Sequence, residues 1–418
     1  MKRYLPIWGL LVLFVPFVLI AQTPERLSLQ QAVEIALRNN PDALTAQTDI
    51  DASGGRVLQA GRIPQPELSI VYNETPTNWR LSSAAEQDVE LTQTIEFPGK
   101  RALRMDAAES GRVVAKLSLE RTKTIVTTRV KRAYFQALLA REVARNLEFT
   151  ITLLTDFLKV VTDRYQSQAS SYLEVIRTKV ELTRLRNDLF EARSDVELRL
   201  AELNVLLGRS GDTAMVLVDS LAYAPLLPSQ EEAIAQFTAQ SFSLRITEQL
   251  VQQGRSLHQL AQRSYFPDLS LSAALQRRPG QTSPPGSTTY FGVGLGLSIP
   301  LWFWQGPKGE VQEAQALLDA NVIRLEGARR RVRQSISAAY RTARVAEQQL
   351  IVFDTSLLKD VEDELRSGIT AYQNNQIDAL NLFDIYRTHR ATKTEHARAL
   401  YNFLAAAADL EASKEIPE

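Results

Sequence analysis

The chain has 418 residues, of which 44% are hydrophobic and 23% are charged, values typical of a folded protein with two or three domains. Its 48 basic residues balance its 48 acidic residues, which excludes the strongly basic composition of a nucleic-acid-binding protein. The absence of cysteine excludes disulfide bonds and lipid attachment to an N-terminal cysteine.

The first 21 residues have the pattern of a secretory signal peptide, which predicts export from the cytoplasm. Lys2 and Arg3 precede an apolar run over residues 5–20, and cleavage is expected near Ala21, although Leu19 is larger than the residue usual before a cleavage site. No later segment has the roughly 18 consecutive apolar residues of a transmembrane helix, so any membrane crossing must use β-strands.

Two helices and two strands are predicted in the next part of the chain. Ser28 is a suitable N-cap for an amphipathic helix over 29–37, and a second helix is expected over about 42–61. Strands are predicted at 67–74 and 88–97, joined by a polar loop, and the second strand alternates apolar with acidic and threonine residues. Strands of about ten residues can cross a bilayer at a tilt.

The longest uninterrupted element is a helix predicted over about 102–164. From Val126 to Val161 its apolar residues recur at alternating spacings of four and three, the heptad pattern of a helix that packs along another helix. A helix of about 60 residues is roughly 90 Å long. After a polar turn, a second heptad pattern predicts a helix over 171–207 that ends at Gly208, so the two helices form an antiparallel hairpin.

The second half of the chain repeats the order of the first half. A steady offset between matching residues predicts a tandem duplication of one unit: helix, strand, strand, long helix, turn and helix. Matching residues, with the offset in parentheses, are Ser28 and Ser229 (201), Val89 and Val293 (204), Tyr134 and Tyr340 (206), and Tyr165 and Tyr372 (207).

The duplication predicts the division of the chain. Its units are a signal peptide at 1–21, a first repeat at 22–214, a linker at 215–228, a second repeat at 229–414 and a tail at 415–418. Within the second repeat, strands are predicted at about 268–277 and 289–299, and helices at about 308–370 and 377–412.

The strand predicted at 289–299 has one apolar face and one face almost without side chains. Its odd-numbered residues from 291 onward are apolar and the even-numbered ones are glycine or serine, as expected where lipid lies on one side and a lumen or close backbone packing on the other. Trp302, Phe303 and Trp304 follow the strand and are predicted to lie at a membrane–water interface.

Four strands cannot close a membrane barrel, because the smallest such barrels have about eight and open sheet edges are not tolerated in lipid. Several chains are therefore expected to share one barrel, with the long helices forming a wall beneath it. Such an assembly is a conduit. Asp88, Glu90 and Glu96 could act as paired carboxylates, but their alternation with apolar residues favours lining of a lumen.

Several stretches together carry a resemblance to a known family. They are the signal peptide, the duplicated unit, Asn40-Pro41, the strand-to-helix junction at 94–101, Arg164-Tyr165 with 173–175, and Tyr372 with 380–384. Over essentially the whole mature chain, the sequence resembles the TolC family of outer-membrane efflux proteins and is most similar to its heavy-metal-efflux (CzcC-type) branch.

The resemblance implies a mainly α-helical chain that contributes two β-hairpins, four strands in all, to a twelve-stranded barrel shared by a homotrimer above a long helical periplasmic tunnel. It implies the outer membrane of a Gram-negative-type cell, with outer-membrane lipid around the barrel. The implied partners are a periplasmic adaptor (membrane-fusion) protein and an inner-membrane pump of the RND type. The implied function is a passive exit duct for small solutes or metal ions, with no catalysis and no cofactor.

The resemblance also places the adaptor contacts at the two tight turns between helices. Gln168 and Asn375 stand where the family usually has a turn glycine, and because glutamine adopts left-handed geometry less readily than asparagine, the first turn is expected to differ in shape. The residues implied at the two turns are Arg164, Tyr165, Gln168, Ser171, Tyr372, Asn375 and Asp378.

In this family, acidic rings often narrow the tunnel near the second turn. Asp384 matches one such position, whereas Asn381 stands where another carboxylate is expected. A threefold ring of Asp384 would attract cations and repel anions in a constriction. The alternative interpretation, a solvated aspartate on a helix surface, has equal weight because exposed charges are the default.

Other interpretations of the sequence were weighed against the duct. His389 and His396 lie seven residues apart, a spacing that favours helix-contact histidines over metal ligands. Two further functions stay open: the exit duct of a type I protein-secretion system, and a soluble periplasmic coiled-coil scaffold or adaptor. The scaffold would need no detergent, and the alternating strands and the tryptophans that follow them argue against it. No constellation of side chains supports an enzyme.

Overall fold

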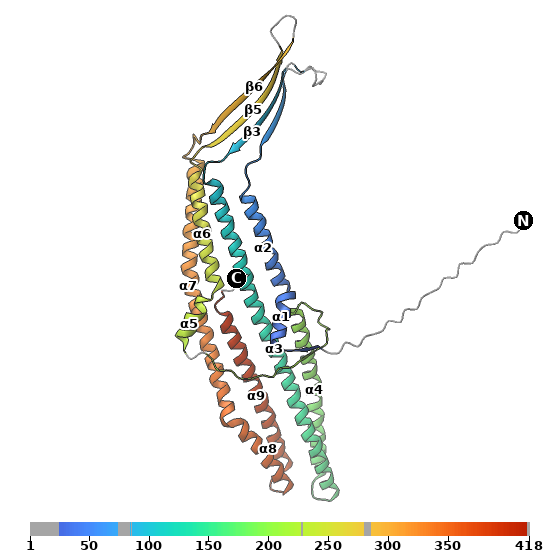
Figure 1. Ribbon diagram of the computed structural model, residues 1–418. Coiled ribbons are helices and arrows are strands. Elements are labelled where there is room, and N and C mark those ends of the chain that lie inside the picture. Colours follow the sequence, from blue (N-terminus) through green and yellow to red (C-terminus); the bar gives the residue numbers. More distant parts are fainter. Residues whose placement is uncertain (1–24, 74–83, 85, 227–228, 280–285, 416–418) are drawn as a thin grey trace, which may run out of the picture.

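The computed structural model describes residues 25–73, 84, 86–226, 229–279 and 286–415. The predicted signal peptide, most of the polar loop after the first strand, and residues 416–418 of the predicted tail lie outside the described residues. The described chain is long and narrow, with four strands at one end and the tips of two helical hairpins at the other (Figure 1). The mainly helical composition expected from the heptad patterns is confirmed.

Helices dominate each half of the chain. Across the described residues, no helix combines the length and the apolar character that crossing a membrane requires. In chain order the elements are β1 (Glu25–Leu27), α1 (Leu29–Asn39), α2 (Pro41–Ala60), β2 (Glu67–Asn73), β3 (Glu86–Ile95), α3 (Lys100–Gln166), α4 (Tyr172–Leu206), β4 (Met215–Leu217), α5 (Gln230–Ala239), α6 (Phe242–Arg263), β5 (Asp268–Pro279), β6 (Ser287–Ser298), α7 (Gly306–Val352), the π-helix η2 (Phe353–Leu357), α8 (Leu358–Gln373) and α9 (Ala379–Ala412).

Side-chain caps set the start of the first two helices. Ser28 accepts a hydrogen bond from the backbone N–H of Gln31, whose side chain accepts one from the N–H of Ser28, which makes the reciprocal capping box of α1. Asn40 caps α2 through the N–H of Asp42, and its side-chain amide donates to the carbonyl of Leu206 at 2.9 Å. The Asn40-Pro41 pair therefore starts α2 and ties it to the end of α4.

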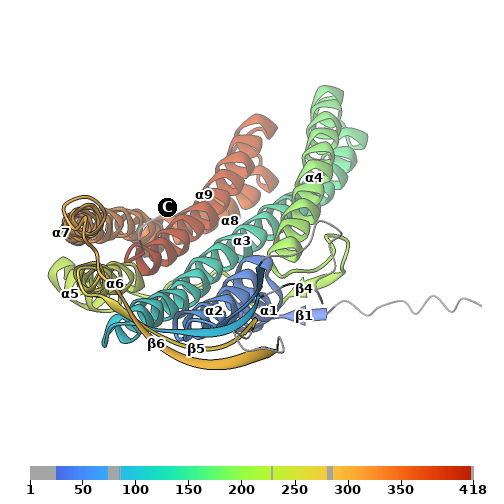
Figure 2. The same cartoon turned by 90° about the horizontal axis from the view of Figure 1, so that it is seen from above.

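Helix α3 is the centre of the wall of helices. It has 67 residues, which gives a length of about 100 Å, and the apolar seam predicted from Val126 to Val161 is buried along most of it. On one side α3 packs against α2 and α4, and on the other against α6 and α9, which in turn pack against α7. Seen from above, α4 and α7 lie at opposite edges of this wall (Figure 2).

The second long helix, predicted at 308–370, runs through α7, η2 and α8 without a gap and contains a π-helical turn that the sequence did not predict. The five residues of η2 form a π-helical turn between α7 and α8. A π-helical turn accommodates one extra residue in a helix. This explains why the offset between the repeats is 206 at Tyr340, before η2, and 207 at Tyr372, after it.

The segment predicted as a linker at 215–228 is partly structured and holds the two halves together. It contains β4, which pairs in parallel with β1 and which the sequence did not predict. Asp219 accepts hydrogen bonds from the N–H of Leu29 at 2.7 Å and from the hydroxyl of Tyr134 at 2.8 Å. Further along, the segment reaches Glu347 of α7, so it is fixed to both long helices.

Glu347 is the buried anchor of this segment on α7. Its carboxylate is 2% exposed and accepts hydrogen bonds from the hydroxyl of Tyr223 at 2.9 Å, the N–H of Leu226 at 3.1 Å and the guanidinium of Arg344. Burial alone would raise the pKa of Glu347, but these donors outweigh it and hold the pKa below its usual value of 4.5. Glu347 therefore stabilises the fold in its ionised form.

Replacing Glu347 with glutamine is expected to lower the free energy of unfolding at pH 7 by about 1–3 kcal/mol, because buried donors lose a charged acceptor. Since the folded pKa is lowered, this contribution is present above the unfolded pKa and is lost as the pH falls through the folded pKa. Denaturant melts at pH 7 and at pH 4 should show a smaller difference at pH 4. Glu313→Gln, at an exposed position of α7, is the control and should change little.

The four long strands form one antiparallel sheet in the order β2-β3-β5-β6. Each lies within a few residues of its predicted range, and β3 pairs with β5, which joins the hairpin of the first repeat to that of the second. The sheet sits above α2, α3, α6 and α7 (Figure 1).

Candidate functional site

One face of the sheet is apolar and is not covered by any described part of the chain. The register aligns Leu91 with Ala273 and Val293, and Val89 with Leu275 and Phe291. Phe291 is 71% exposed and Val293 69%. An uncovered apolar face that crosses four strands needs an apolar environment outside the chain. The alternation predicted in the strands is confirmed.

The opposite face carries polar and small residues. The register aligns Thr92 with Ser272 and Gly294 across three strands. A Cβ atom at Gly294 would lie 2.5 Å from the hydroxyl oxygen of Ser272, so the glycine leaves room for the serine hydroxyl in its present position. Glu90 lies on this face opposite Ala274. This face can line a polar lumen.

Both edges of the sheet are open within the chain. β2 has only β3 as a neighbour, and β6 has only β5, among the described strands. Open edges present unpaired backbone N–H and C=O groups, which proteins pair or cover. In lipid such groups must be paired.

The stretch Pro98-Gly99-Lys100-Arg101 joins the sheet to the helices. Gly99 adopts a φ of 94° at the start of α3. Lys100 pairs with Asp268 at 2.7 Å, and Asp268 also accepts the N–H of Phe97 at 2.7 Å, which connects the end of β3 to the start of β5. The side chain of Arg101 donates to the carbonyl of Gly61 at 2.7 Å, at the end of α2.

A second ion pair strengthens the same junction. Arg104 binds both carboxylate oxygens of Glu96, at 2.7 and 2.9 Å, and donates to the carbonyl of Ala60. The hydrogen bond from Arg104 ties Glu96 to α3, so this carboxylate supports the junction. The predicted interface residues Trp302, Phe303 and Trp304 lie in turns between β6 and α7, at the same end of the sheet, and all three are exposed.

The two predicted docking turns lie together at the far end of the helices (Figure 1). The guanidinium of Arg164 donates to the carbonyl of Tyr372 at 2.9 Å and lies 4.7 Å from the centre of its ring. Tyr165 and Tyr172 form an exposed pair of rings 5.3 Å apart. Ser171 and Asp378 are the N-caps of α4 and α9. The structure therefore brings the sequence-predicted turn residues to one end of the molecule.

The two turns have the same backbone geometry, so the expected difference in shape is wrong. Gln168 has a φ of 64° and Asn375 a φ of 58°. In the first turn the N–H of Ala169 donates to the carbonyl of Arg164 at 2.7 Å, and in the second the N–H of Gln376 donates to that of Ala371 at 2.8 Å. Both are Schellman caps, whose hydrogen bonds stabilise left-handed geometry even for glutamine.

An aromatic cluster joins the two tips. The ring of Phe157 on α3 lies edge-on to Tyr372 at 4.8 Å, to Phe383 at 5.7 Å and to Tyr386 at 6.1 Å. Tyr372 is buried and donates its hydroxyl to Glu174 at 3.1 Å. Burial and the neighbouring Glu174 raise the pKa of Tyr372 to about 12. This predicted docking residue therefore supports the tip from within and presents no ring at its surface.

Asp384 and Asn381 lie on the exposed side of α9. The Asp384 side chain is 73% exposed and lies 3.4 Å from Arg387. The N–H of Asn381 donates to the capping side chain of Asp378 at 2.9 Å. A single chain thus leaves Asp384 at the surface, where symmetry copies could gather it into a ring.

Two arginines of α9 that the sequence did not single out bridge the tips. Arg387 lies 3.7 Å from Glu181, and Arg390 lies 3.5 Å from Asp188, both on α4. These pairs connect residues about 200 positions apart, and no local spacing indicates them. The duplication gives no signal either, since the equivalent positions in α4 are Val180 and Thr183.

The two histidines weighed as metal ligands contact aromatic rings instead. His389 is buried and its ring lies 5.8 Å from that of Phe149, while the ring of His396 lies 6.1 Å from that of Phe353. Burial, with the nearby Lys393, lowers the pKa of His389. Among the described residues, no three histidine or acidic side chains lie close enough together to hold a metal ion.

Comparison with known proteins decides the family. The pattern described as outer membrane efflux protein matches this sequence twice, over residues 32–209 and 233–415. The chain belongs to the outer membrane efflux protein family. The resemblance to TolC-like channels inferred from the residues is thereby confirmed.

One relative is similar to this chain in sequence, and solved outer membrane channels share its fold. This chain is 21% identical over 362 residues to the cobalt-zinc-cadmium resistance protein CzcC of Cupriavidus metallidurans. The matched region covers 87% of this chain and 84% of CzcC. The outer membrane protein VceC of Vibrio cholerae is 14% identical with a TM-score of 0.72, over 92% of this chain and 95% of VceC. The open-state MtrE outer membrane channel of Neisseria gonorrhoeae is 15% identical with a TM-score of 0.75, and the match covers 92% of this chain and 88% of MtrE.

Proposed function

We propose that three copies of this chain form a passive exit duct in the outer membrane. The observation that carries the proposal is the four-stranded sheet, which has an uncovered apolar face, a polar face and two open edges. Edge-to-edge pairing of three such sheets gives a closed twelve-stranded barrel with its apolar face toward lipid and its polar face toward a lumen. The long helices, which continue from the sheet, form the periplasmic tunnel.

The paired tips are the proposed contact with a periplasmic adaptor, which links the duct to an inner-membrane pump of the RND type. Gln168 and Asn375 are exposed at the two turns, and their fixed left-handed geometry gives an adaptor a defined surface. Tyr165 and Tyr172 add an exposed aromatic contact beside the first turn, and aromatic residues of this kind are enriched at protein interfaces.

Small cationic solutes, metal ions among them, are the proposed cargo. The related CzcC is named for resistance to cobalt, zinc and cadmium. We further propose that the exposed Asp384 side chains of three copies form a ring near the tips, which would attract cations. The duct itself needs no catalytic group.

Reconstitution in planar bilayers tests the proposal. The purified protein should insert from detergent and conduct ions in discrete steps. Absence of any conductance from correctly folded protein would exclude a duct and would favour the coiled-coil scaffold.

Asp384→Ala is expected to keep this conductance but reduce its preference for cations. Three carboxylates about 10 Å from an ion in water attract it by about 1 kcal/mol, a roughly fivefold effect that salt screens. The measurement is the reversal potential in a salt gradient, with Asp212→Ala, at an exposed position beyond α4, as a control of equal charge. An unchanged reversal potential in Asp384→Ala would remove the ring from the proposal.

A further inference from the structure

The apolar face of the sheet ends in a row of polar side chains at the end away from the helices. The last apolar row takes one residue from each strand, and its members, 38–71% exposed, are Ile70, Val89, Leu275 and Phe291. The next row on the same face lies two residues further along each strand. It consists of Tyr72, Gln87, Arg277 and Thr289. The apolar surface therefore stops abruptly at this polar row.

The polar row lies where a hydrocarbon layer would end. On β5 the apolar residues of this face extend from Leu269 to Leu275, a stretch of about 20 Å at the usual rise of a strand. The apolar band of membrane barrels is about 25 Å tall. Trp302 and Trp304 follow the other end of the sheet, next to the helices. The polar row is therefore at the headgroup level of the leaflet that faces away from the helical wall.

Arg277 is exposed, and it is the only charged residue on the apolar face among the described residues of the four long strands. The neighbouring Arg278 lies on the polar face and pairs across the strands with Glu86 at 3.9 Å. A basic residue on the lipid side of a strand is costly at the middle of a bilayer and costs almost nothing at its surface. The acidic residues of these strands also lie on the polar face, and they are Glu67, Glu86, Asp88, Glu90 and Asp268.

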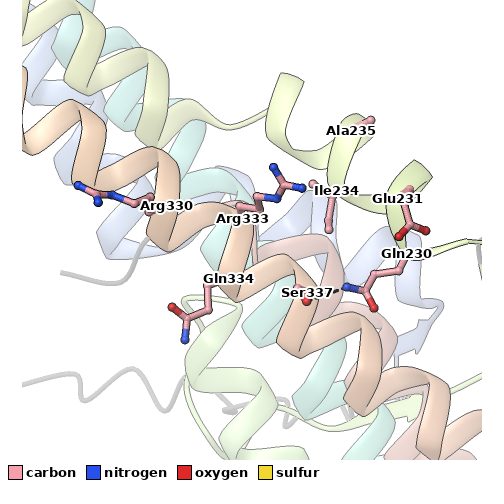
Figure 3. A pocket seen from close by; sticks show the side chains of 8 residues that line it. All are labelled: Gln230, Glu231, Ile234, Ala235, Arg330, Arg333, Gln334 and Ser337. Atoms are coloured by element: carbon pink, nitrogen blue, oxygen red, sulfur yellow. Dashed lines mark hydrogen bonds between the residues drawn. The ribbon is translucent and has the colours of Figure 1, made fainter.

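Exposed arginines on the helices have different surroundings. Figure 3 shows Arg330 and Arg333 of α7 in a groove of about 590 Å³ beside α5, with Glu231 among the residues that line it. Charged side chains on a water-exposed helix are the default and need no special partner. Arg277 differs because the row next to it on its own face is entirely apolar. A sheet that contacts lipid through this face places Arg277 among lipid headgroups.

We propose that Arg277 binds a phosphate group of the lipid in the outer leaflet. A guanidinium presents paired N–H donors that match two phosphate oxygens. Gln87 and Thr289 flank Arg277 in the same row and add an amide and a hydroxyl, while Tyr72 adds an aromatic residue of the kind enriched at membrane interfaces. The ligand is the phosphorylated glycolipid of the leaflet that faces away from the periplasm.

This lipid site rests on the proposed shared barrel, since only a sheet inserted in the outer membrane meets that leaflet. Three copies of the chain would carry three equivalent sites around the outside of the barrel. Because each site lies on the lipid side, it is separate from the lumen through which solutes pass.

Lipid binding by the full chain, purified in detergent, tests the site. The probe is diphosphorylated lipid A, and native mass spectrometry counts the bound copies over a range of lipid concentrations. The parent protein should bind up to three copies per trimer. Arg277→Gln should bind the lipid about fivefold more weakly, the effect of one basic residue near an anionic lipid surface. Arg277→Lys should keep part of the binding, because it retains the charge but loses the paired donors.

Arg278→Gln is the matched control, since it removes the same charge from the adjacent residue on the opposite face, and it should leave lipid binding unchanged. Lipid A without its phosphates should bind the parent protein more weakly. Equal binding by the parent and Arg277→Gln, an equal loss in Arg278→Gln, or undiminished binding of the lipid without phosphates would each overturn the site and leave the barrel in place. A protein with the mass of one chain in detergent would overturn both.

Discussion

Phe157→Ala is expected to destabilise the tip end of the molecule by about 3–5 kcal/mol, the usual cost of deleting a buried aromatic side chain. Phe157 is 5% exposed and its ring contacts three others, on α8 and α9. Its loss leaves a cavity between the two helical hairpins. Because the cluster lies in the apolar core that the two hairpins share, the tips should open more often than the rest of the chain.

Hydrogen exchange resolves this effect along the chain. Amide exchange should accelerate in the lower part of α3 and in α8 and α9, with little change near the sheet. Leu58→Ala, at a position 80% exposed, is the control and should alter stability by less than about 0.5 kcal/mol. Equal protection of the tips in Phe157→Ala and the parent would show that the aromatic cluster does not hold the hairpins together.

Gly208→Ala has the second large expected effect, a loss of about 3 kcal/mol or more from a left-handed backbone and a steric clash together. Gly208 has a φ of 71°, and a Cβ atom there would lie 2.4 Å from the carbonyl oxygen of Asn39. Backbone atoms cannot move aside as a flexible side chain can. The junction between the end of α4 and the start of α2, held by Asn40, should therefore loosen.

Gly54→Ala provides a matched control in a helix. No heavy atom outside its own helix lies within 4 Å of a Cβ atom at Gly54, so alanine should stabilise α2 by about 0.5–1 kcal/mol. Thermal melts of the two variants should move in opposite directions. A Gly208→Ala variant as stable as the parent would contradict the close approach to Asn39.

Periodic features of the fold could be predicted from the sequence. The heptad seam of α3 and the two-residue alternation of β3 and β6 are encoded in the order of apolar residues, because one face of each element needs a different environment from the other. Ser28 and Gly208 marked helix ends correctly, since each residue has a strong local reason to stand there.

Short or irregular features could not be predicted in this way. β1 and β4 have three residues each, too few to show alternation. The offset between the repeats rises by one between Tyr340 and Tyr372, which indicates one extra residue in the second repeat. The offset does not show whether this residue lies in a π-helical turn or in a longer tip. The structure places it in η2.

In the candidate site, too, some residues could be predicted from the sequence and others could not. The turn residues were named because the family resemblance places adaptor contacts at both tight turns, and the duplication shows these turns at equivalent places. The links that hold the tips together, Phe157 with Tyr372 and Arg390 with Asp188, join positions far apart in the sequence. Such contacts depend on how the two hairpins cross, and that geometry leaves no local pattern in the chain.

The central claim, that several copies of this chain complete one barrel above a helical tunnel, is tested most directly by electron cryomicroscopy of the detergent-purified protein. We expect a particle of three chains in which β6 of each copy pairs with β2 of the next, so that no sheet edge is open. A monomer whose four-stranded sheet folds onto its own helices and covers its apolar face would contradict the account.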